Sequence, residues 1–256
     1  MNSTSINITI LGSGTCVPSL RRSACSVLLE INDNKILIDS GPGTTRRLLE
    51  AGHTINQLSH IFYSHFHPDH ISELTSILFS SKYSSLSRKI PLTVTAGQGL
   101  FKFYENLKSV FGHWIELENM LLDEMNISKS DHRKFECFDL ETMPTKHNPE
   151  SLGFRFTSKS GKTVVYSGDT DECDGLIKIA QKANLFICES AMPDKLKVKG
   201  HLTPSLAGKI AQEALVDKLI LTHLYPECDK ANIVQECRTT YSGPLWIAED
   251  LMQLSV

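Results

Sequence analysis

Ser64-His65-Phe66-His67-Pro68-Asp69-His70 places three imidazoles and one carboxylate within six positions of the chain. The apolar run before it, residues 59–63, predicts a buried strand. Pro68 and the residues that follow it predict the first turn of a helix. We therefore expect this cluster of polar side chains to lie on a strand-to-helix loop.

The spacing within this loop suits two metal ions. Side chains two apart on an extended segment point to the same side, so His65 and His67 can bind one ion. Asp69 and His70, which lie beyond the bend, can face a second ion. A single histidine in a loop is more often a surface or core residue, but four potential ligands at this spacing favour a metal site. Because one loop cannot hold two metals alone, further ligands must come from later strands.

The pattern His-x-His-x-Asp-His resembles the signature of the metallo-β-lactamase superfamily. This resemblance implies an α/β fold, the four-layer αββα sandwich, with residues 1–256 forming a single hydrolase domain. A length of 256 residues and a hydrophobic content of 41% are sufficient for one sizeable core.

Three later positions match the remaining ligands of the superfamily. His147 corresponds to its third imidazole, Asp169 in the turn after the apolar run 163–167 to its bridging carboxylate, and His223 to its last ligand. The resemblance thus implies a first site of His65, His67, His147 and Asp169, and a second site of Asp69, His70, His223 and Asp169. Asp39 matches a residue that supports the metal loop by hydrogen bonds and does not itself bind metal.

Imidazole and carboxylate ligands without cysteine suit two first-row divalent ions, with zinc as the default and manganese or iron as alternatives. Two such ions about 3.5–4 Å apart hold a bridging hydroxide and stabilise the oxygens of a displacement at phosphorus. The implied reaction is hydrolysis of an ester by this hydroxide, with Asp69 among the catalytic residues.

Glu189 and His201 indicate the type of ester. Glu189 ends an apolar run, and His201 precedes a helix that Thr203 and Pro204 begin. Together they are similar to the ribonuclease Z branch of the superfamily, in which a Glu and a His support protonation of the leaving group. This similarity predicts a phosphodiesterase with Glu189 and His201 as further catalytic residues.

The chain departs from ribonuclease Z in one place. Only residues 157–162 separate two strands between which that enzyme carries its tRNA-binding arm. The net charge of −3 also disfavours binding of tRNA by overall charge. Shorter relatives without the arm include phosphodiesterases acting on cyclic nucleotides, among them enzymes that destroy cyclic pyrimidine-nucleotide signals. We therefore expect a small phosphodiester or nucleotide substrate, first of all a cyclic nucleotide.

Three alternatives to this function remain open. The first is a tRNA 3′-processing endonuclease, which requires a basic surface. The second is a hydrolase of a non-phosphate ester, and the third is a binding module that holds a nucleotide without turnover. Phe111, His113 and Trp114 are candidates for holding a base, in the same or a neighbouring subunit, although closing the core or a dimer contact is the preferred interpretation. Relatives are commonly homodimers, so we expect a homodimer.

The composition predicts a soluble protein of the cytoplasm. The seven cysteines are scattered and form no Cys-x-x-Cys pair, as a reducing compartment permits. Residues 1–5 show no feature of a signal peptide, and no apolar run approaches the roughly 20 residues of a membrane span.

The periodicity of the remaining sequence predicts further elements. Strands are expected at 7–11, 25–30, 35–39, 92–95, 134–138, 152–156, 185–190 and 218–222. Helices are expected at 44–51, from Pro68 through Phe79 to a serine-rich break at 80–87, at 97–110, and after Pro204. Residues 115–131 give no clear period and are interpreted as helix or irregular. The histidines without a matching role, interpreted as solvated or structural, are His53, His60, His113 and His132.

Overall fold

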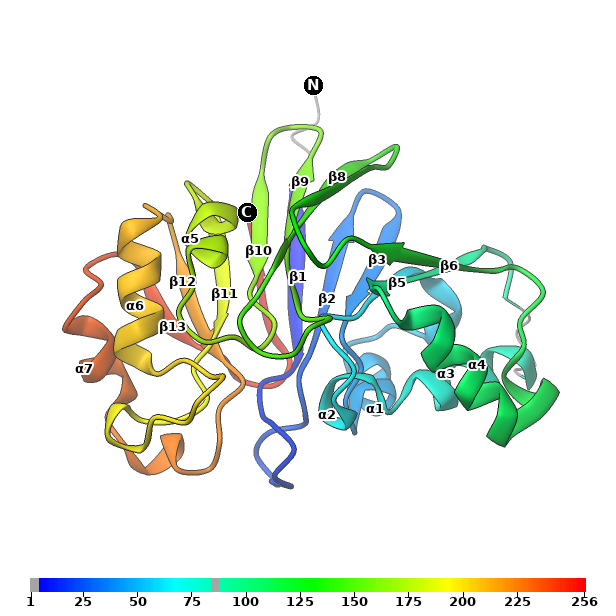
Figure 1. The fold of residues 1–256 in the computed structure, drawn as a ribbon, viewed down its shortest axis with the longest axis horizontal. Coiled ribbons are helices and arrows are strands. Elements are labelled where there is room, and N and C mark those ends of the chain that lie inside the picture. Colours follow the sequence, from blue (N-terminus) through cyan, green and yellow to red (C-terminus); the bar gives the residue numbers. More distant parts are fainter. Residues whose placement is uncertain (1–4, 84–87) are drawn as a thin grey trace.

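The computed structural model describes residues 5–83 and 88–256. Two seven-stranded sheets pack against each other, and helices cover their outer faces (Figure 1). The first sheet has the order β14 (Met252–Ser255), β1 (Ile6–Gly12), β2 (Ser26–Ile31), β3 (Asn34–Ile38), β4 (Leu58–Phe62), β5 (Leu92–Gly97) and β6 (Met120–Met125). The second has the order β13 (Leu245–Ile247), β12 (Leu219–Thr222), β11 (Leu185–Glu189), β10 (Thr163–Tyr166), β9 (Leu152–Ser158), β8 (Phe138–Pro144) and β7 (Asp131–Lys134).

The helices form the two outer layers. Those near the first sheet are α1 (Thr44–Glu50), α2 (Pro68–Ile71), α3 (Leu74–Tyr83) and α4 (Leu100–Phe111), and those on the second are α5 (Asp174–Ala180), α6 (Pro204–Glu213) and α7 (Ile233–Arg238). Short 3₁₀ turns are η1 (Ile55–Gln57), η2 (Gly112–Ile115), η3 (Asp194–Leu196) and η4 (Cys228–Lys230). This arrangement confirms the expected four-layer αββα sandwich.

The core has three apolar layers, as this architecture requires. One layer lies between the sheets, where Ile6, Ile8 and Ile10 of β1 are buried in the same cluster as Phe154 and Phe156 of β9. The alternation along each strand explains which side chains face inward. The other two apolar layers join the outer sheet faces to the helices.

Parallel strands at the centre of each sheet decide where the functional side chains lie. β3, β4 and β5 are parallel neighbours in the first sheet, and β10, β11 and β12 are parallel neighbours in the second. The carboxyl ends of parallel strands meet at one edge of a sheet, where open α/β sheets commonly bind ligands. Asp39, His65, Asp169, Glu189 and His223 all follow or end such strands.

The helix expected from Pro68 through Phe79 is interrupted, which corrects the prediction. α2 and α3 are separate because the backbone N–H of Glu73 donates to Ser40 O at 3.0 Å and not to the preceding turn. The Glu73 carboxylate accepts the N–H groups of Gly43 and Thr45, both at 2.6 Å, at the start of α1. Helix α3 then continues to Tyr83, beyond the expected break at residue 80, and residues 84–87 of that break lie outside the described residues.

Residues 115–138 also differ from the prediction. Residues 134–138 were expected to be one strand but form the connection between β7 and β8, with Phe135 N donating to Phe138 O at 2.9 Å. Phe135 and Cys137 pack partly against the core, which produces a strand-like alternation in a turn. The stretch 115–131 contains the edge strand β6, whose alternation is obscured because most of its side chains are only partly buried.

The other expected strands and helices are present, with ends shifted by a few residues. Residues 159–162 join β9 to β10 in a short connection, closed by a hydrogen bond from Ser158 N to Lys162 O at 2.8 Å. This connection leaves no room for an arm at that place. None of the helices in residues 5–83 and 88–256 has the length and apolar character that crossing a membrane requires.

His60 is a structural histidine on β4. Its ring centroid lies 4.9 Å from that of Phe135 and 5.6 Å from that of Phe138. Burial lowers the pKa of His60 to about 4. In the unfolded chain a histidine binds its proton below a pH of about 6.5. The free energy of unfolding should therefore fall as the pH drops from about 6.5 towards 4, because only the unfolded state takes up this proton.

The variant His60→Phe tests this dependence. Between pH 7.5 and pH 5, the metal-free wild type should lose about 2 kcal/mol more free energy of unfolding than the variant. Urea unfolding of both proteins at both pH values measures the difference. An equal loss in the two proteins would show that His60 does not take up a proton on unfolding.

Candidate metal centre

The candidate ligands come from segments far apart in the sequence and meet at one edge of the sheets. They are His65 and His67 on the β4–α2 loop, Asp69 and His70 on α2, His147 between β8 and β9, Asp169 after β10 and His223 after β12. The expected strand-to-helix loop is present, and Pro68 occupies the first turn of α2. His147 lies in a loop three residues beyond β8 and not at the end of the strand.

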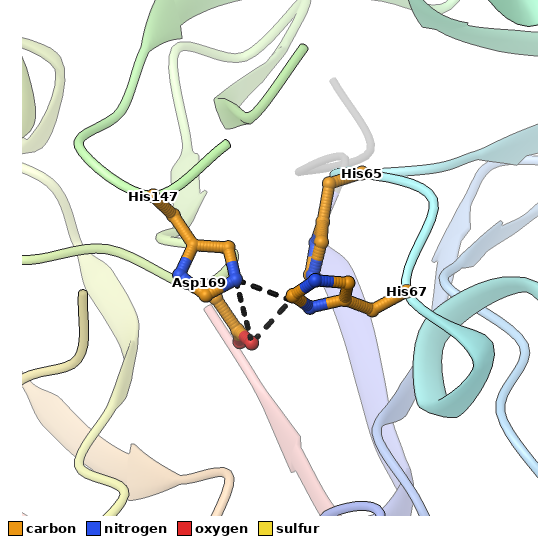
Figure 2. Close-up of side chains that lie close together, drawn as sticks. All are labelled: His65, His67, His147 and Asp169. Atoms are coloured by element: carbon orange, nitrogen blue, oxygen red, sulfur yellow. Dashed lines mark hydrogen bonds and ion pairs between the residues drawn. The ribbon is translucent and has the colours of Figure 1, made fainter. Parts of the chain in front are cut away.

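The first group of ligands contains His65, His67, His147 and Asp169, and its ligand atoms all lie within 4.8 Å of one another. Figure 2 shows His147 facing the two histidines of the β4–α2 loop, with the Asp169 carboxylate beside them. His147 Nε2 lies 3.1 Å from His67 Nδ1, and Asp169 Oδ2 lies 3.6 Å from His65 Nε2. Nitrogen and oxygen atoms that converge in this way form a pocket of the size that a divalent ion needs.

The second group contains Asp69, His70 and His223, again within 4.8 Å of one another. His223 Nε2 lies 3.6 Å from Asp69 Oδ2. Asp169 is close to this group as well, because its Oδ2 lies 3.4 Å from Nε2 of both His70 and His223. Asp169 is thus positioned between the two groups.

Several ligand atoms are buried and have no hydrogen-bond partner in the described part of the chain. They are Nε2 of His65, His70 and His223 and Oδ1 of Asp169. A buried polar atom without a partner costs free energy, so such atoms need an unseen partner. Four of them around one space, all of types that bind divalent ions, fit a metal centre.

The protonation states of Asp169 and His65 suit metal binding, which needs ionised carboxylates and neutral imidazoles. At His70, burial lowers the pKa but the carboxylates of Asp169 and Asp39 outweigh it and raise the pKa well above its usual value, so a metal ion there must displace a proton. Burial raises the pKa of Asp169, but His223 and His70 reverse this effect and hold the pKa well below its usual value. Burial, together with the nearby His70, lowers the pKa of His65 well below its usual value. At neutral pH, Asp169 is therefore ionised and His65 is neutral.

Asp39 holds the metal loop as expected of a supporting residue. It adopts a left-handed backbone conformation, with φ 57°, at the end of β3. Its carboxylate accepts hydrogen bonds from Ser64 N and Ser64 Oγ at 2.8 Å, from Tyr166 Oη at 2.8 Å, and from His70 Nδ1 at 2.7 Å. The last bond leaves His70 Nε2 to face the metal group, as in metal sites where an outer carboxylate orients a histidine.

Gly168 allows the loop and β10 to approach each other. Its φ is +58°, and a Cβ atom there would lie 2.8 Å from the Cβ atom of Ser64 and 2.9 Å from Leu152 O. A larger residue would push the Ser64 segment away from Asp169. The glycine before the aspartate is thus required by close packing as well as by backbone conformation.

Glu189 and His201, both predicted, lie together beside the metal groups. His201 Nδ1 donates to Glu189 Oε1 at 3.1 Å and lies 3.9 Å from Asp169 Oδ2. Glu189 is buried and also accepts the N–H groups of Thr170 at 2.8 Å and Leu202 at 3.1 Å. Burial lowers the pKa of His201, but the hydrogen bond to Glu189 outweighs it and raises the pKa above its usual value.

Asn148 is a residue of the site that sequence reasoning missed. Its Nδ2 lies 3.0 Å from His67 Nε2, whereas the other ring nitrogen of His67, Nδ1, faces His147. Because an amide can present either nitrogen or oxygen, Asn148 can bond to His67 in either tautomer. The only signal in the sequence is the position of Asn148 directly after His147, which identifies no function by itself.

The variant Asn148→Ala is expected to weaken zinc binding at the first group by about 10- to 100-fold, as loss of a partner that orients a ligand typically does. Titration of metal-free protein with Zn²⁺ against a competing chelator measures this affinity. Asn106→Ala, in an exposed position on α4, is the matched control and should bind zinc like the wild type. Unchanged zinc affinity in Asn148→Ala would show that the packing of His67 suffices to orient it.

The aromatic residues at the end of α4 are not brought to the metal groups. Phe111 and Trp114 line a cavity of about 380 Å³ with Thr75, Ser76, Phe79 and Ile115, none of which is a candidate ligand. Both are substantially exposed, at 41% and 48%, so they do not close the core. His113 packs on the Trp114 ring at 4.4 Å between centroids. A role in holding a base within the same subunit is not supported by this position.

Known proteins resemble this chain along nearly its whole length. Ribonuclease Z of Methanosarcina acetivorans is 25% identical over 306 aligned positions, which cover 98% of each protein. The crystal structure of the metallo-β-lactamase fold protein YhfI from Bacillus subtilis superimposes with a TM-score of 0.85 at 22% identity, covering 99% of this chain and all of YhfI. Human tRNase Z, short form, superimposes with a TM-score of 0.81 at 26% identity and covers 98% and 99% of the two chains.

A family model covers most of the chain as well. The model described as Anti-Pycsar protein Apyc1 matches residues 6–232, a range that contains every candidate ligand as well as Glu189 and His201. The two-sheet architecture agrees with the metallo-β-lactamase fold of YhfI. The chain therefore belongs to the Anti-Pycsar protein Apyc1 family and has the metallo-β-lactamase fold.

Proposed function

We propose that the protein is a dinuclear-metal phosphodiesterase that hydrolyses a small phosphodiester, in the first place a cyclic nucleotide. It is a metallo-hydrolase of the ribonuclease Z and phosphodiesterase type, as its family and its relatives indicate. The observation that carries the finer proposal is the position of Asp169 between two groups of metal-ligand side chains, with the Glu189–His201 pair beside it.

We assign a first ion to His65, His67, His147 and Asp169, and a second to Asp69, His70, His223 and Asp169. Zinc is the default for such ligands, and manganese or iron are alternatives. When bound, two divalent ions supply an activated water at neutral pH and neutralise charge on the phosphoryl oxygens. Asp169 and His70 are both buried.

The residues of the chain supply the proton for the leaving group. Glu189 accepts the Nδ1 proton of His201 and thereby fixes the orientation of the imidazole ring. The raised pKa of His201 keeps the ring protonated to higher pH than usual. His201 Nε2 can then donate its proton to the departing alkoxide, as a general acid does.

The small size of the substrate is supported by the chain itself. The short β9–β10 connection carries no tRNA-binding arm, and the net charge of the chain is −3. The name of the family, Anti-Pycsar, agrees with enzymes that remove cyclic pyrimidine-nucleotide signals. Processing of tRNA is the second candidate, because relatives are named ribonuclease Z and tRNase Z.

We further propose a cytoplasmic homodimer. All seven cysteines are free thiols, as a reducing compartment would keep them. The exposed Phe111 and Trp114 are available for a subunit contact. Sedimentation of the metal-loaded protein at several concentrations would test the dimer, and a monomer at all concentrations would rule it out.

Hydrolysis of two sets of substrates by the metal-loaded protein tests the function. The first set holds 3′,5′-cyclic nucleotides with each of the four bases, and the second holds a 3′-extended tRNA precursor. Asp69→Ala should abolish turnover, whereas a protein that only binds nucleotides would keep its affinity. Asp33→Ala, in the exposed β2–β3 turn, is the matched control. Cleavage of the tRNA alone would overturn the proposal in favour of the endonuclease.

A further inference from the structure

His223 differs from the other histidines of the candidate metal centre in how its ring is held. In each of the other four, one ring nitrogen lies within 3.0 Å of a polar atom outside the two groups of ligands. These atoms are Ser64 Oγ for His65, Asn148 Nδ2 for His67, Asp39 Oδ2 for His70 and Gly200 O for His147. In His223, neither Nδ1 nor Nε2 has a hydrogen-bond partner in the described part of the chain. The position of this ring therefore depends on packing and on the backbone that carries it.

The backbone of His223 adopts a conformation that is rare for a histidine. Its φ is +56°, in the left-handed region. A residue with a β-carbon is strained at this φ and keeps the conformation only where its surroundings hold it. On one side, Ser190 N donates to Thr222 O at 2.9 Å, which continues the pairing of β11 with β12. On the other side, Leu224 N donates to Ser13 O at 3.0 Å.

The contact between Leu224 and Ser13 joins the two sheets beside the second group of ligands. Ser13 follows β1 of the first sheet, whereas His223 and Leu224 follow β12 of the second. Asp69 and His70, the partners of His223 in the second group, are carried by the first sheet through the β4–α2 loop. The position of Ser13 therefore helps to set the distance between His223 and these two ligands.

Three hydrogen bonds fix Ser13, which is fully buried. Asp250 Oδ1 accepts Ser13 N at 3.0 Å and Ser13 Oγ at 2.8 Å. Arg22 Nη1 donates to Ser13 Oγ at 2.7 Å. The hydroxyl group of Ser13 thus lies between a guanidinium and a carboxylate, and hydrogen bonds with charged partners are the stronger ones.

Asp250 also holds the other end of the loop that Ser13 begins. Its Oδ2 accepts Ser23 N at 2.7 Å and lies 3.1 Å from Arg47 Nη2. The Asp250 side chain is only 6% exposed. One buried carboxylate from the connection between β13 and β14 therefore fixes both ends of the loop 13–23.

The two glycines beside Ser13 let this loop close tightly. A Cβ atom on Gly12 would lie 1.9 Å from Ala24 O, and one on Gly14 would lie 2.8 Å from Arg22 Cβ. The sequence Gly12-Ser13-Gly14 therefore brings the Ser13 backbone directly against the other end of the loop. This close approach lets Asp250 bond to both ends at once.

We propose that Asp250 is a positioning residue for the second metal ion. Through Ser13 it holds the backbone of Leu224, and with it the strained His223, opposite the other ligands of the second group. The proposal rests on the proposed function, because it requires an ion in this group. Loss of the Asp250 carboxylate should weaken binding of the second ion and leave binding of the first ion unchanged.

Zinc affinity in two backgrounds tests this role, measured by titration of metal-free protein against a competing chelator. His147→Ala damages the first group and His223→Ala damages the second, so each background leaves one group to be measured. Adding Asp250→Ala to His147→Ala should weaken zinc binding by about 10- to 100-fold, as loss of a residue that orients a ligand typically does. Adding it to His223→Ala should change the affinity by no more than about twofold, as for independent sites.

Glu249→Ala is the matched control. It removes the same charge from the neighbouring position, where the side chain is 68% exposed and pairs with Arg21. This variant should keep the zinc affinity of both backgrounds. Ser13→Ala replaces Asp250→Ala if the latter shows no cooperative unfolding in urea. It removes the hydroxyl between Asp250 and Arg22 but keeps Ser13 O, and it should also weaken only the second ion.

Three results would overturn the role of Asp250. They are an equal loss of zinc affinity in the two backgrounds, no loss in His147→Ala, and the same loss in the Glu249→Ala control. If the wild type binds zinc but hydrolyses no phosphodiester, the proposed function fails, and the zinc affinities still test Asp250.

Hydrogen exchange of the Leu224 amide provides a test that needs neither metal nor substrate. In the metal-free protein, this amide should exchange at least about tenfold faster in Asp250→Ala than in the wild type, because its bond to Ser13 O is loosened. The amides of β9 should exchange at the wild-type rate. An unchanged rate at Leu224 would refute the link from Asp250 to His223, even if the wild type binds no zinc.

Discussion

Asp169→Asn is expected to lower kcat/KM by about a thousandfold and to reduce the metal content from two ions to at most one per chain. A bound metal ion contributes several kcal/mol to a reaction of this kind, and each 1.36 kcal/mol is about a factor of ten in rate. Asp169 Oδ2 lies 3.4 Å from Nε2 of both His70 and His223, and Oδ1 is buried without a partner in the described residues.

The amide of asparagine has the same shape as the carboxylate but removes its charge. The amide nitrogen takes the place of one carboxylate oxygen, and as a hydrogen-bond donor it cannot bind a cation. Elemental analysis after dialysis measures the metal content, and hydrolysis of bis(p-nitrophenyl) phosphate measures the rate. Asp174→Asn, at the exposed start of α5, is the control and should retain both ions. Two ions in Asp169→Asn would show that this residue does not bridge the two groups.

His201→Ala is expected to lower kcat by about 10²- to 10⁴-fold for substrates whose leaving group is an alkoxide. The reason is that an alkoxide needs a proton as it departs, and we assign this donation to His201. For bis(p-nitrophenyl) phosphate the loss should stay below about tenfold, because p-nitrophenolate leaves without a proton. Comparison of kcat for the two types of substrate measures this difference.

Glu189→Gln keeps the shape of the side chain but removes the charge that holds His201 Nδ1 at 3.1 Å. The kcat of Glu189→Gln should depend on the leaving group in the same way as that of His201→Ala. The loss of kcat should be smaller, as expected of a positioning residue. Metal content must be measured in both variants, because Asp169, His201 and His223 also form a group that could hold an ion. A loss of metal in His201→Ala would identify His201 as a ligand and exclude its role as the general acid.

The strand-to-helix loop that carries four of the candidate ligands could be predicted because its pattern is local. The spacing of His65, His67, Asp69 and His70 within six positions is a property of the chain itself. Glu189, at the end of an apolar strand, and His201, just before a helix with Pro204 in its first turn, could be found because together they resemble a Glu and a His of the ribonuclease Z branch. Strand ends next to turns are recognisable without knowledge of the fold.

Prediction was wrong where a contact distant in sequence overrides a local pattern. The helix after Pro68 is interrupted because Glu73 bonds to Ser40 and caps α1, which no local pattern reveals. Phe135 and Cys137 are apolar residues two positions apart, as in a strand. Both lie in the turn between β7 and β8, and both pack against the core. The edge strand β6 was missed because partial exposure removes the alternation that identifies a strand.

The sequence by itself determined the four-layer fold, the residue types that can bind metal, and the absence of an arm between β9 and β10. The fold and the missing arm follow from the resemblance of the chain to a known superfamily, and the residue types from the short spacing of the metal loop. Only the tertiary structure decided the distances of Asp169 from His70 and His223, the contact of Asn148 with His67, and the contact of Gly200 with His147. Such contacts join residues about 50 to 100 positions apart. They exist only because the parallel strands of two separate sheets end at the same edge of the molecule.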